Sequence, residues 1–155
     1  MFHKSMLLVP ALLMVAGLAF TACDDDDDDG SDSGDGTVNV ELNEFVVSAD
    51  PDSVGAGEVK FVVENIGEET HEFVVVKTDL DAESLPTGED GAFDEEGDGV
   101  TVVDEIEDIA SGTTQDLTVD LEAGSYVLVC NIVDDADDPP ESHYAEGMHT
   151  GFTVE

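Results

Sequence analysis

The chain has 155 residues, 41% of them apolar, which is enough for one ordinary domain with a single hydrophobic core and too little for a multidomain enzyme. It carries 40 acidic residues against three lysines and no arginine, and its formal charge is −37 at pH 7. We expect no nucleic acid partner, because phosphate contacts depend on Lys and Arg side chains.

The acidity predicts a response to salt. Repulsion between carboxylates weakens a compact state at low ionic strength, and added salt screens that repulsion. We therefore predict that the melting temperature rises between low and molar NaCl, which a thermal unfolding series followed by circular dichroism measures. The high negative charge thus favours a protein from a salt-rich habitat, and a flat response would remove this argument. A basic redox partner or a cation-binding surface would also explain the acidity.

The N-terminus predicts an export signal. A basic start is followed by an apolar run over residues 6–20 and then by Thr21-Ala22-Cys23. The run is too short to span a bilayer comfortably. The small residues before the cysteine resemble a bacterial lipobox, which makes residues 1–22 a lipoprotein-type signal peptide and Cys23 the lipidated first residue of the mature chain. Plain secretion, with Cys23 an incidental residue, is the alternative.

An acidic, glycine-containing segment follows the signal. Six consecutive aspartates begin at Asp24, and Ser, Asp and Gly residues continue to Gly36. Such a sequence buries nothing and repels itself, so residues 23–36 are predicted to be a disordered tether. The tether would hold the domain at the outer face of the cytoplasmic membrane, with the lipid on Cys23 as anchor. A periplasmic or secreted protein is the alternative.

Alternating apolar and polar residues predict strands across the folded domain, residues 37–155. The acidic stretch 79–99 lacks this periodicity and is predicted to be an inserted surface loop. About seven short strands separated by turns predict an all-β fold, an antiparallel β-sandwich. The predicted strands cover residues 38–42, 59–63, 73–77, 100–103, 117–121, 126–130 and 152–154.

Four side chains of the domain offer metal donors in a distinctive order. His71 opens a predicted strand, Cys130 ends a buried one, and His143 and Met148 follow with four residues between them. Two imidazoles, a thiolate and a thioether are the donors of a blue copper site. Taken singly, a capping role for His71 and a packing role for Cys130 are the ordinary explanations. If Cys23 is lipidated, Cys130 is the one free cysteine of an exported protein and is at risk of oxidation, and metal ligation would explain its presence.

Three runs carry a family resemblance: Thr70-His71-Glu72-Phe73, Val129-Cys130-Asn131 and His143-Tyr144-Ala145-Glu146-Gly147-Met148. They resemble the cupredoxin family of small blue copper proteins, close to plastocyanin and halocyanin-like members, and the resemblance spans the whole folded domain. It implies a Greek-key β-sandwich and one-electron transfer. It also implies one type 1 copper ion, with ligands His71, Cys130, His143 and Met148.

The sequence departs from the family pattern in two places. Twelve residues, 131–142, separate Cys130 from His143, where the family has a much shorter connection. The extra stretch from Val133 to Pro140 would either bulge outward and leave the ligands in place or loosen His143. Glu72 stands where many relatives have an asparagine that ties the two ligand loops together, although exported relatives often share the His-Glu-Phe variant.

Two neighbouring residues have competing interpretations. His149 competes with Met148 for a ligand position, but side chains alternate along a strand, which predicts that His149 faces away from the metal if Met148 faces it. Tyr144 follows His143 directly and is expected either to join a docking surface or to pack against the domain.

The sequence therefore predicts an exported, monomeric electron carrier that has a redox protein as partner and contacts the membrane through Cys23. It is not expected to be an enzyme, since it shows no paired-carboxylate, Ser-His-Asp or phosphate-loop signature. The first alternative is a module that stores, delivers or senses copper through the same ligands. The second is a copper-free β-sandwich for interactions, whose carboxylates bind Ca²⁺ or solvate the surface.

Overall fold

The computed structural model describes residues 36–136 and 139–155. The predicted signal peptide, Cys23 and all of the predicted tether except Gly36 lie outside the described residues. Within the described ranges, the one helical element is a 3-10 turn, η1 (Ala82–Ser84), and no helix there has the length and apolar character needed to cross a bilayer.

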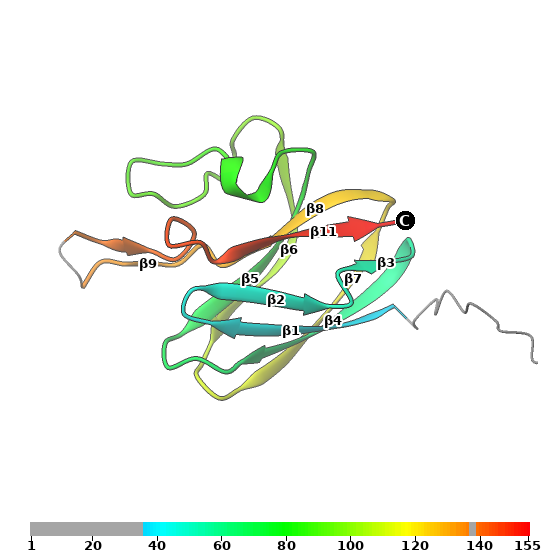
Figure 1. Cartoon of the computed structure of the whole chain (residues 1–155), viewed down its shortest axis with the longest axis horizontal. Coiled ribbons are helices and arrows are strands. Elements are labelled where there is room, and N and C mark those ends of the chain that lie inside the picture. The colour runs from blue at the N-terminus through cyan, green and yellow to red at the C-terminus, as the bar shows by residue number, and fades with distance from the viewer. Residues whose placement is uncertain (1–35, 137–138) are drawn as a thin grey trace, which may run out of the picture. The chain divides into compact units, whose positions relative to one another are not determined.

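Two β-sheets pack on each other around the core (Figure 1). The first has the order β2 (Val46–Asp50), β1 (Thr37–Asn43), β4 (Gly57–Asn65) and β7 (Thr114–Leu121). The second has the order β3 (Ser53–Val54), β11 (His149–Val154), β8 (Gly124–Val129), β5 (His71–Thr78) and β6 (Val100–Ile109). Neighbouring strands are antiparallel except for the pairs β1–β4 and β3–β11.

The chain passes repeatedly from one sheet to the other, as from β4 to β5, from β6 to β7 and from β7 to β8. This connectivity, with mostly antiparallel neighbours, confirms the predicted all-β Greek-key sandwich. All seven predicted strands are present. The described residues also hold the edge strands β2 and β3 and a small hairpin of β9 (Val133–Asp134) and β10 (Glu141–Ser142), which the pattern did not predict.

Strand β6 is much longer than the predicted 100–103. Its second half is dominated by acidic residues, which suppress the apolar alternation used to find strands. These residues are tolerated because β6 lies at the edge of its sheet, where side chains reach water. The strand ends at Ile109, which is fully buried.

The main core lies between the two sheets and explains the alternation in the sequence. The inward residues of β1 and β4, such as Val40 and Val63, are fully or almost fully buried. Phe61 is central: its ring lies 5.2 Å from that of Phe73 and 5.6 Å from that of Phe152. Burying these apolar side chains supplies the main driving force for folding.

A second apolar cluster covers the outer face of β5 and β8. The segment 79–99 is irregular, as predicted, but it is more than a surface loop because Leu85 and Phe93 are buried in this cluster. The Tyr144 hydroxyl fastens the segment, since it donates to the carbonyl of Ala82 (2.9 Å) and accepts from the N–H of Leu85 (3.0 Å). Of its two predicted roles, Tyr144 therefore has the packing one.

Candidate metal centre

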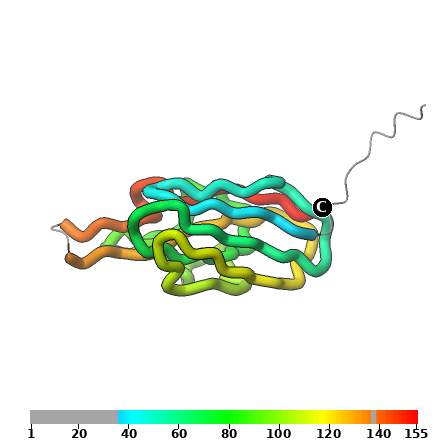
Figure 2. The backbone as a smooth tube through the Cα atoms, turned by 90° about the horizontal axis from the view of Figure 1, so that it is seen from below, coloured from blue at the N-terminus to red at the C-terminus, as the bar shows by residue number. Residues whose placement is uncertain are grey.

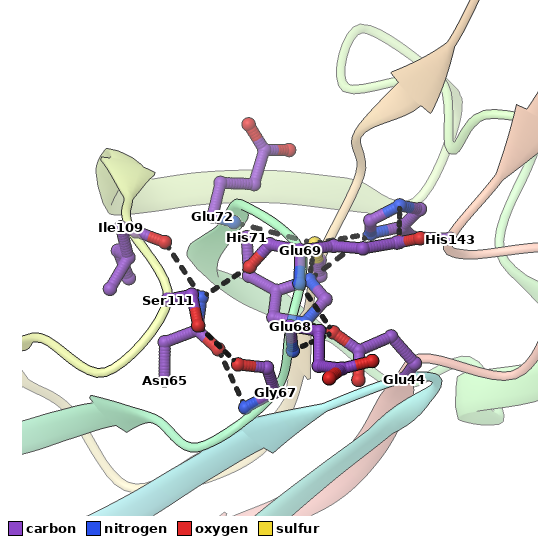
Figure 3. Close-up of polar contacts among 11 residues, drawn as sticks. Glu44, Asn65, Gly67, Glu68, Glu69, His71, Glu72, Ile109, Ser111 and His143 are labelled. Carbon is purple, nitrogen blue, oxygen red and sulfur yellow. Dashed lines mark hydrogen bonds and ion pairs between the residues drawn. The ribbon is translucent and has the colours of Figure 1, made fainter.

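The side chains of His71, Cys130 and His143 lie together. Figure 3 shows how His71 and His143 face each other. His71 is the first residue of β5, Cys130 directly follows β8, and antiparallel pairing of these two strands brings their ends together. The Nδ1 atoms of the two histidines are 3.3 Å apart, and Cys130 Sγ lies 3.4 Å from His143 Nδ1 and 3.9 Å from His71 Nδ1. The exposed fractions are 0% for His71 and Cys130 and 2% for His143.

These distances fit a metal ion in the plane of the three donors. A circle through the two Nδ1 atoms and Sγ has a radius of about 2.1 Å, as fixed by the three separations. Bonds from imidazole nitrogen and thiolate sulfur to a first-row metal such as zinc measure about 2.0–2.3 Å. The chemistry of the set, two nitrogens and one soft sulfur, is that of a trigonal copper site.

Met148 is held beside this group by the backbone. Its N–H donates to the carbonyl of His143 (2.9 Å), and its own carbonyl accepts from the N–H of Cys130 (3.0 Å). Met148 is fully buried in the same core cluster as Cys130. Its role as an axial ligand stays a prediction.

His149 lies on the face of β11 that is opposite to the donor group. It pairs in register with Val129, a residue of the outer cluster, and its ring lies 5.0 Å from that of Tyr144. It does not belong to the His71–Cys130–His143 group. This is the placement that strand alternation predicts for a neighbour of an inward Met148.

The long connection between Cys130 and His143 forms a hairpin that leaves the site undisturbed. Strands β9 and β10 pair, and the N–H of His143 donates to the carbonyl of Ile132 (2.9 Å), which closes the neck of the hairpin. Beyond this neck the hairpin projects past the other strands in both views (Figures 1 and 2). Only Asn131 separates Cys130 from the neck, so the bulged-out alternative of the two predictions holds.

Shortening the hairpin tests this interpretation. Asp134 and Glu141 are paired, and an Asn-Gly dipeptide in place of residues 135–140 would join them by a two-residue turn. We predict unchanged metal affinity and an unchanged visible spectrum after copper loading, because the neck and all donors remain. Absorption spectroscopy and a competition titration with a chelator measure both. A shifted or weakened spectrum would show that residues beyond the neck shape the site.

No protein-family model and no curated protein matches the chain, but solved structures do. An auracyanin from Roseiflexus castenholzii is 19% identical over 77% of this chain and 97% of that chain, with a TM-score of 0.53. An azurin, Az-iso2, from Methylomonas sp. strain J is 17% identical over 79% and 99%, with a TM-score of 0.51. Reduced rusticyanin is 19% identical over 79% and 81%, with a TM-score of 0.50. These proteins are cupredoxins.

The chain has the cupredoxin fold. The cupredoxin fold that the three short runs of sequence implied is thereby confirmed. Within this cupredoxin fold the His71–Cys130–His143 group is built from the first residue of β5, the segment after β8 and the neck of the β9–β10 hairpin.

Glu72 links the start of β5 to the segment after β8. Its backbone N–H donates to Cys130 Sγ (3.4 Å), and its carboxylate accepts from the N–H of Asn131 (2.8 Å). The Asn131 side chain in turn bonds both the N–H and the carbonyl of Phe93 (2.6 and 2.9 Å). Glu72 thus links the two ligand segments, so this departure from the family pattern leaves them joined. Burial raises the pKa of Glu72 to about 7.

Burial also sets the protonation states of the donors. It raises the pKa of the Cys130 thiol to about 11, so the thiol keeps its proton at neutral pH until a metal displaces it. It lowers the pKa of both His71 and His143, which favours the neutral, ligating form of each imidazole. Metal binding is therefore expected to release the thiol proton.

Two residues that support the site were missed in the sequence. The Glu44 carboxylate lies against His71, and a backbone hydrogen bond from Glu69 lowers the pKa of Glu44, so it is ionised at neutral pH. Asn65 is fully buried and makes three hydrogen bonds, two to the loop before His71 and one to Ile109 at the end of β6. Asn65 occupies an inward position of β4, and an asparagine in an apolar alternation is a signal that could have been noticed. Glu44 is one of 40 acidic residues and carries no such signal.

Proposed function

We propose that this protein binds one copper ion as a type 1 centre and carries single electrons between redox proteins. The observation that carries the proposal is the buried triangle of donors formed by His71 Nδ1, His143 Nδ1 and Cys130 Sγ. Met148, buried next to Cys130, is the proposed weak axial ligand. The chain has the cupredoxin fold. Its resemblance to cupredoxins implies that it binds copper and transfers electrons as they do.

The surrounding residues suit electron transfer better than turnover of a substrate. A bound copper ion would supply a one-electron couple, because nitrogen donors suit its divalent state and sulfur donors its monovalent state. The chain holds the donors in place through backbone and side-chain hydrogen bonds, such as those of Glu72 and Met148. Burial of all three donors limits access of water and of substrates. We therefore propose a carrier and not an enzyme.

Copper loading tests the proposal. The purified protein should bind one equivalent of Cu(II), become intensely blue and show narrow copper hyperfine splitting in electron paramagnetic resonance. Reduction and reoxidation should remove and restore the colour with little loss of copper. Metal content must be measured alongside, since zinc accepts the same donors.

The alternatives predict different results in the same experiment. A protein that stores, delivers or senses copper would give up its metal readily to a chelator and reduce sluggishly. A copper-free interaction domain would stay colourless and bind no copper at all.

We further propose that the redox partner is basic. A groove beside His143 is lined by the carboxylates of Glu69, Asp108 and Asp134. Both lysines in the described residues already pair with carboxylates. Electrostatic attraction of this kind accelerates association and weakens with salt. Cationic hexaammineruthenium should therefore reduce the copper-loaded protein faster at low salt, whereas an anionic complex should show the opposite trend.

Export and lipid anchoring complete the proposal. The support is the signal-like N-terminus and the position of Cys23 after small residues. Metabolic palmitate labelling should attach to the wild-type chain and be lost in Cys23→Ala. Unlabelled but secreted wild-type protein would favour plain secretion.

A further inference from the structure

We propose that Glu44 is a positioning residue for His71, and that its charge lowers the reduction potential of the copper. The inference rests on the proposed copper function. It names a residue from outside the three ligand runs, located in the turn between β1 and β2.

Glu44 reaches from one sheet to a ligand at the end of the other. Its Oε1 atom accepts hydrogen bonds from the backbone N–H groups of Glu68 and Glu69, both at 2.8 Å. The same atom lies 3.2 Å from His71 Nε2 (Figure 3). The Glu44 side chain is 24% exposed, whereas that of His71 is fully buried. One carboxylate oxygen therefore fixes both the loop before His71 and the imidazole itself.

This contact defines which nitrogen of His71 can bind the metal. A carboxylate only accepts hydrogen bonds, so the proton of the neutral imidazole belongs on Nε2. Nδ1 is then left with its lone pair directed at His143 Nδ1 and Cys130 Sγ, 3.3 and 3.9 Å away. Metal-bound histidines commonly donate their second ring N–H to such a partner, which fixes the ring and raises the basicity of the ligand.

The loop is shaped to admit the carboxylate. A Cβ atom at Gly67 would overlap the Glu44 carboxylate. Because glycine has no Cβ, the carboxylate fits beside the loop. Asn65 holds Gly67 in turn, since its Oδ1 accepts from the N–H of Gly67 at 2.9 Å. The contact between Glu44 and His71 is thus built into the folded loop and is not an incidental surface contact.

His143 has a similar but weaker contact with a carboxylate. His143 Nε2 lies 3.5 Å from a Glu69 carboxylate oxygen, and the Glu69 side chain is 48% exposed. The longer distance and greater exposure both reduce the effect of a charge. Of these two carboxylates, Glu44 should therefore have the larger influence on the metal.

The sign of the effect follows from electrostatics. A negative charge close to a ligand stabilises Cu(II) more than Cu(I), because Cu(II) has the larger positive charge. Glu44→Gln keeps a similar shape and an oxygen that accepts hydrogen bonds, but removes the charge. We expect the ratio of Cu(I) to Cu(II) affinity to rise about tenfold, a potential increase of about 59 mV for one electron.

Glu68→Gln is the matched control. It removes the same charge from the same loop but leaves in place the backbone N–H through which Glu68 contacts Glu44. We expect it to change the affinity ratio by less than about twofold, because its side chain is exposed to solvent. Equal shifts in the two variants, or no shift in Glu44→Gln, would overturn the charge effect.

A second measurement needs no metal. In the metal-free protein, nitrogen-15 NMR of the imidazoles should show His71 as a single tautomer with its proton on Nε2. Glu44→Gln should keep that tautomer, and Glu44→Ala should yield a mixture. A single Nε2–H tautomer that persists in Glu44→Ala would refute the positioning role. A folded wild-type chain that takes up no copper would refute the proposed function, whereas the tautomer result would still decide the role of Glu44.

Discussion

The Cys130→Ser variant should lose the blue colour of the copper-loaded protein completely. The visible absorption depends on the thiolate, and a serine hydroxyl is neither a soft donor nor readily deprotonated. The backbone should survive the change, because serine is close to cysteine in size and can still accept the hydrogen bond from the N–H of Glu72. Absorption and electron paramagnetic resonance spectra after Cu(II) loading measure the loss, with circular dichroism as the test of folding.

The second cysteine of the chain provides the control for this experiment. Cys23→Ser changes the predicted lipidation site and leaves the donor group intact, so the blue colour should remain. A folded Cys130→Ser protein that still turns blue would contradict the proposed ligand set. Loss of colour in both variants would point to a general failure of copper loading.

The Asn65→Ala variant should lower the free energy of unfolding by about 3 kcal/mol. The Asn65 amide donates to the carbonyls of Glu69 (2.7 Å) and Ile109 (2.8 Å), and its oxygen accepts from the N–H of Gly67 (2.9 Å). Each hydrogen bond contributes about 1 kcal/mol net, and leaving buried partners unsatisfied costs more. Such a loss is large against a typical total stability of about 5–15 kcal/mol.

Chemical denaturation in the metal-free state measures this effect without interference from ligand binding. Asn43→Ala is the matched control, since Asn43 is exposed at the end of β1 and its loss should cost less than about 0.5 kcal/mol. The Asn65 variant should also retain copper less tightly, because its hydrogen bonds shape the loop before His71. A stability loss below about 1 kcal/mol would show that the loop is held by other contacts.

The strands could be predicted from the sequence wherever one face is buried. Strands β1, β4 and β7 alternate clearly because their outward residues are polar, and β8 has a continuous apolar run because both its faces are covered. The end of β6 could not be found this way, since an edge strand rich in carboxylates has no apolar pattern. Likewise, the buried Leu85 and Phe93 stand alone in an acidic segment, and only the folded chain shows what they cover.

The metal centre, too, could be predicted only in part from the sequence. The histidines and the cysteine stand in short runs whose residue types suggest a donor set, and the structure brings the three together. The supporting contacts of Glu44 depend on a turn more than twenty residues before His71, as shown by its bonds to the loop at Glu68 and Glu69. No local pattern identifies such a partner, because its role arises only when the two sheets meet.

The closed neck at Ile132 and His143 gives this scaffold a natural insertion point. Because the hydrogen bond between His143 and Ile132 and the pairing of β9 with β10 join the two sides, we expect that the number of residues beyond them can vary without moving the donors. Motif searches that demand a fixed count between the cysteine and the second histidine would overlook chains of this kind. Protein engineers could graft an epitope or an electrode-binding peptide there, beside the proposed copper site.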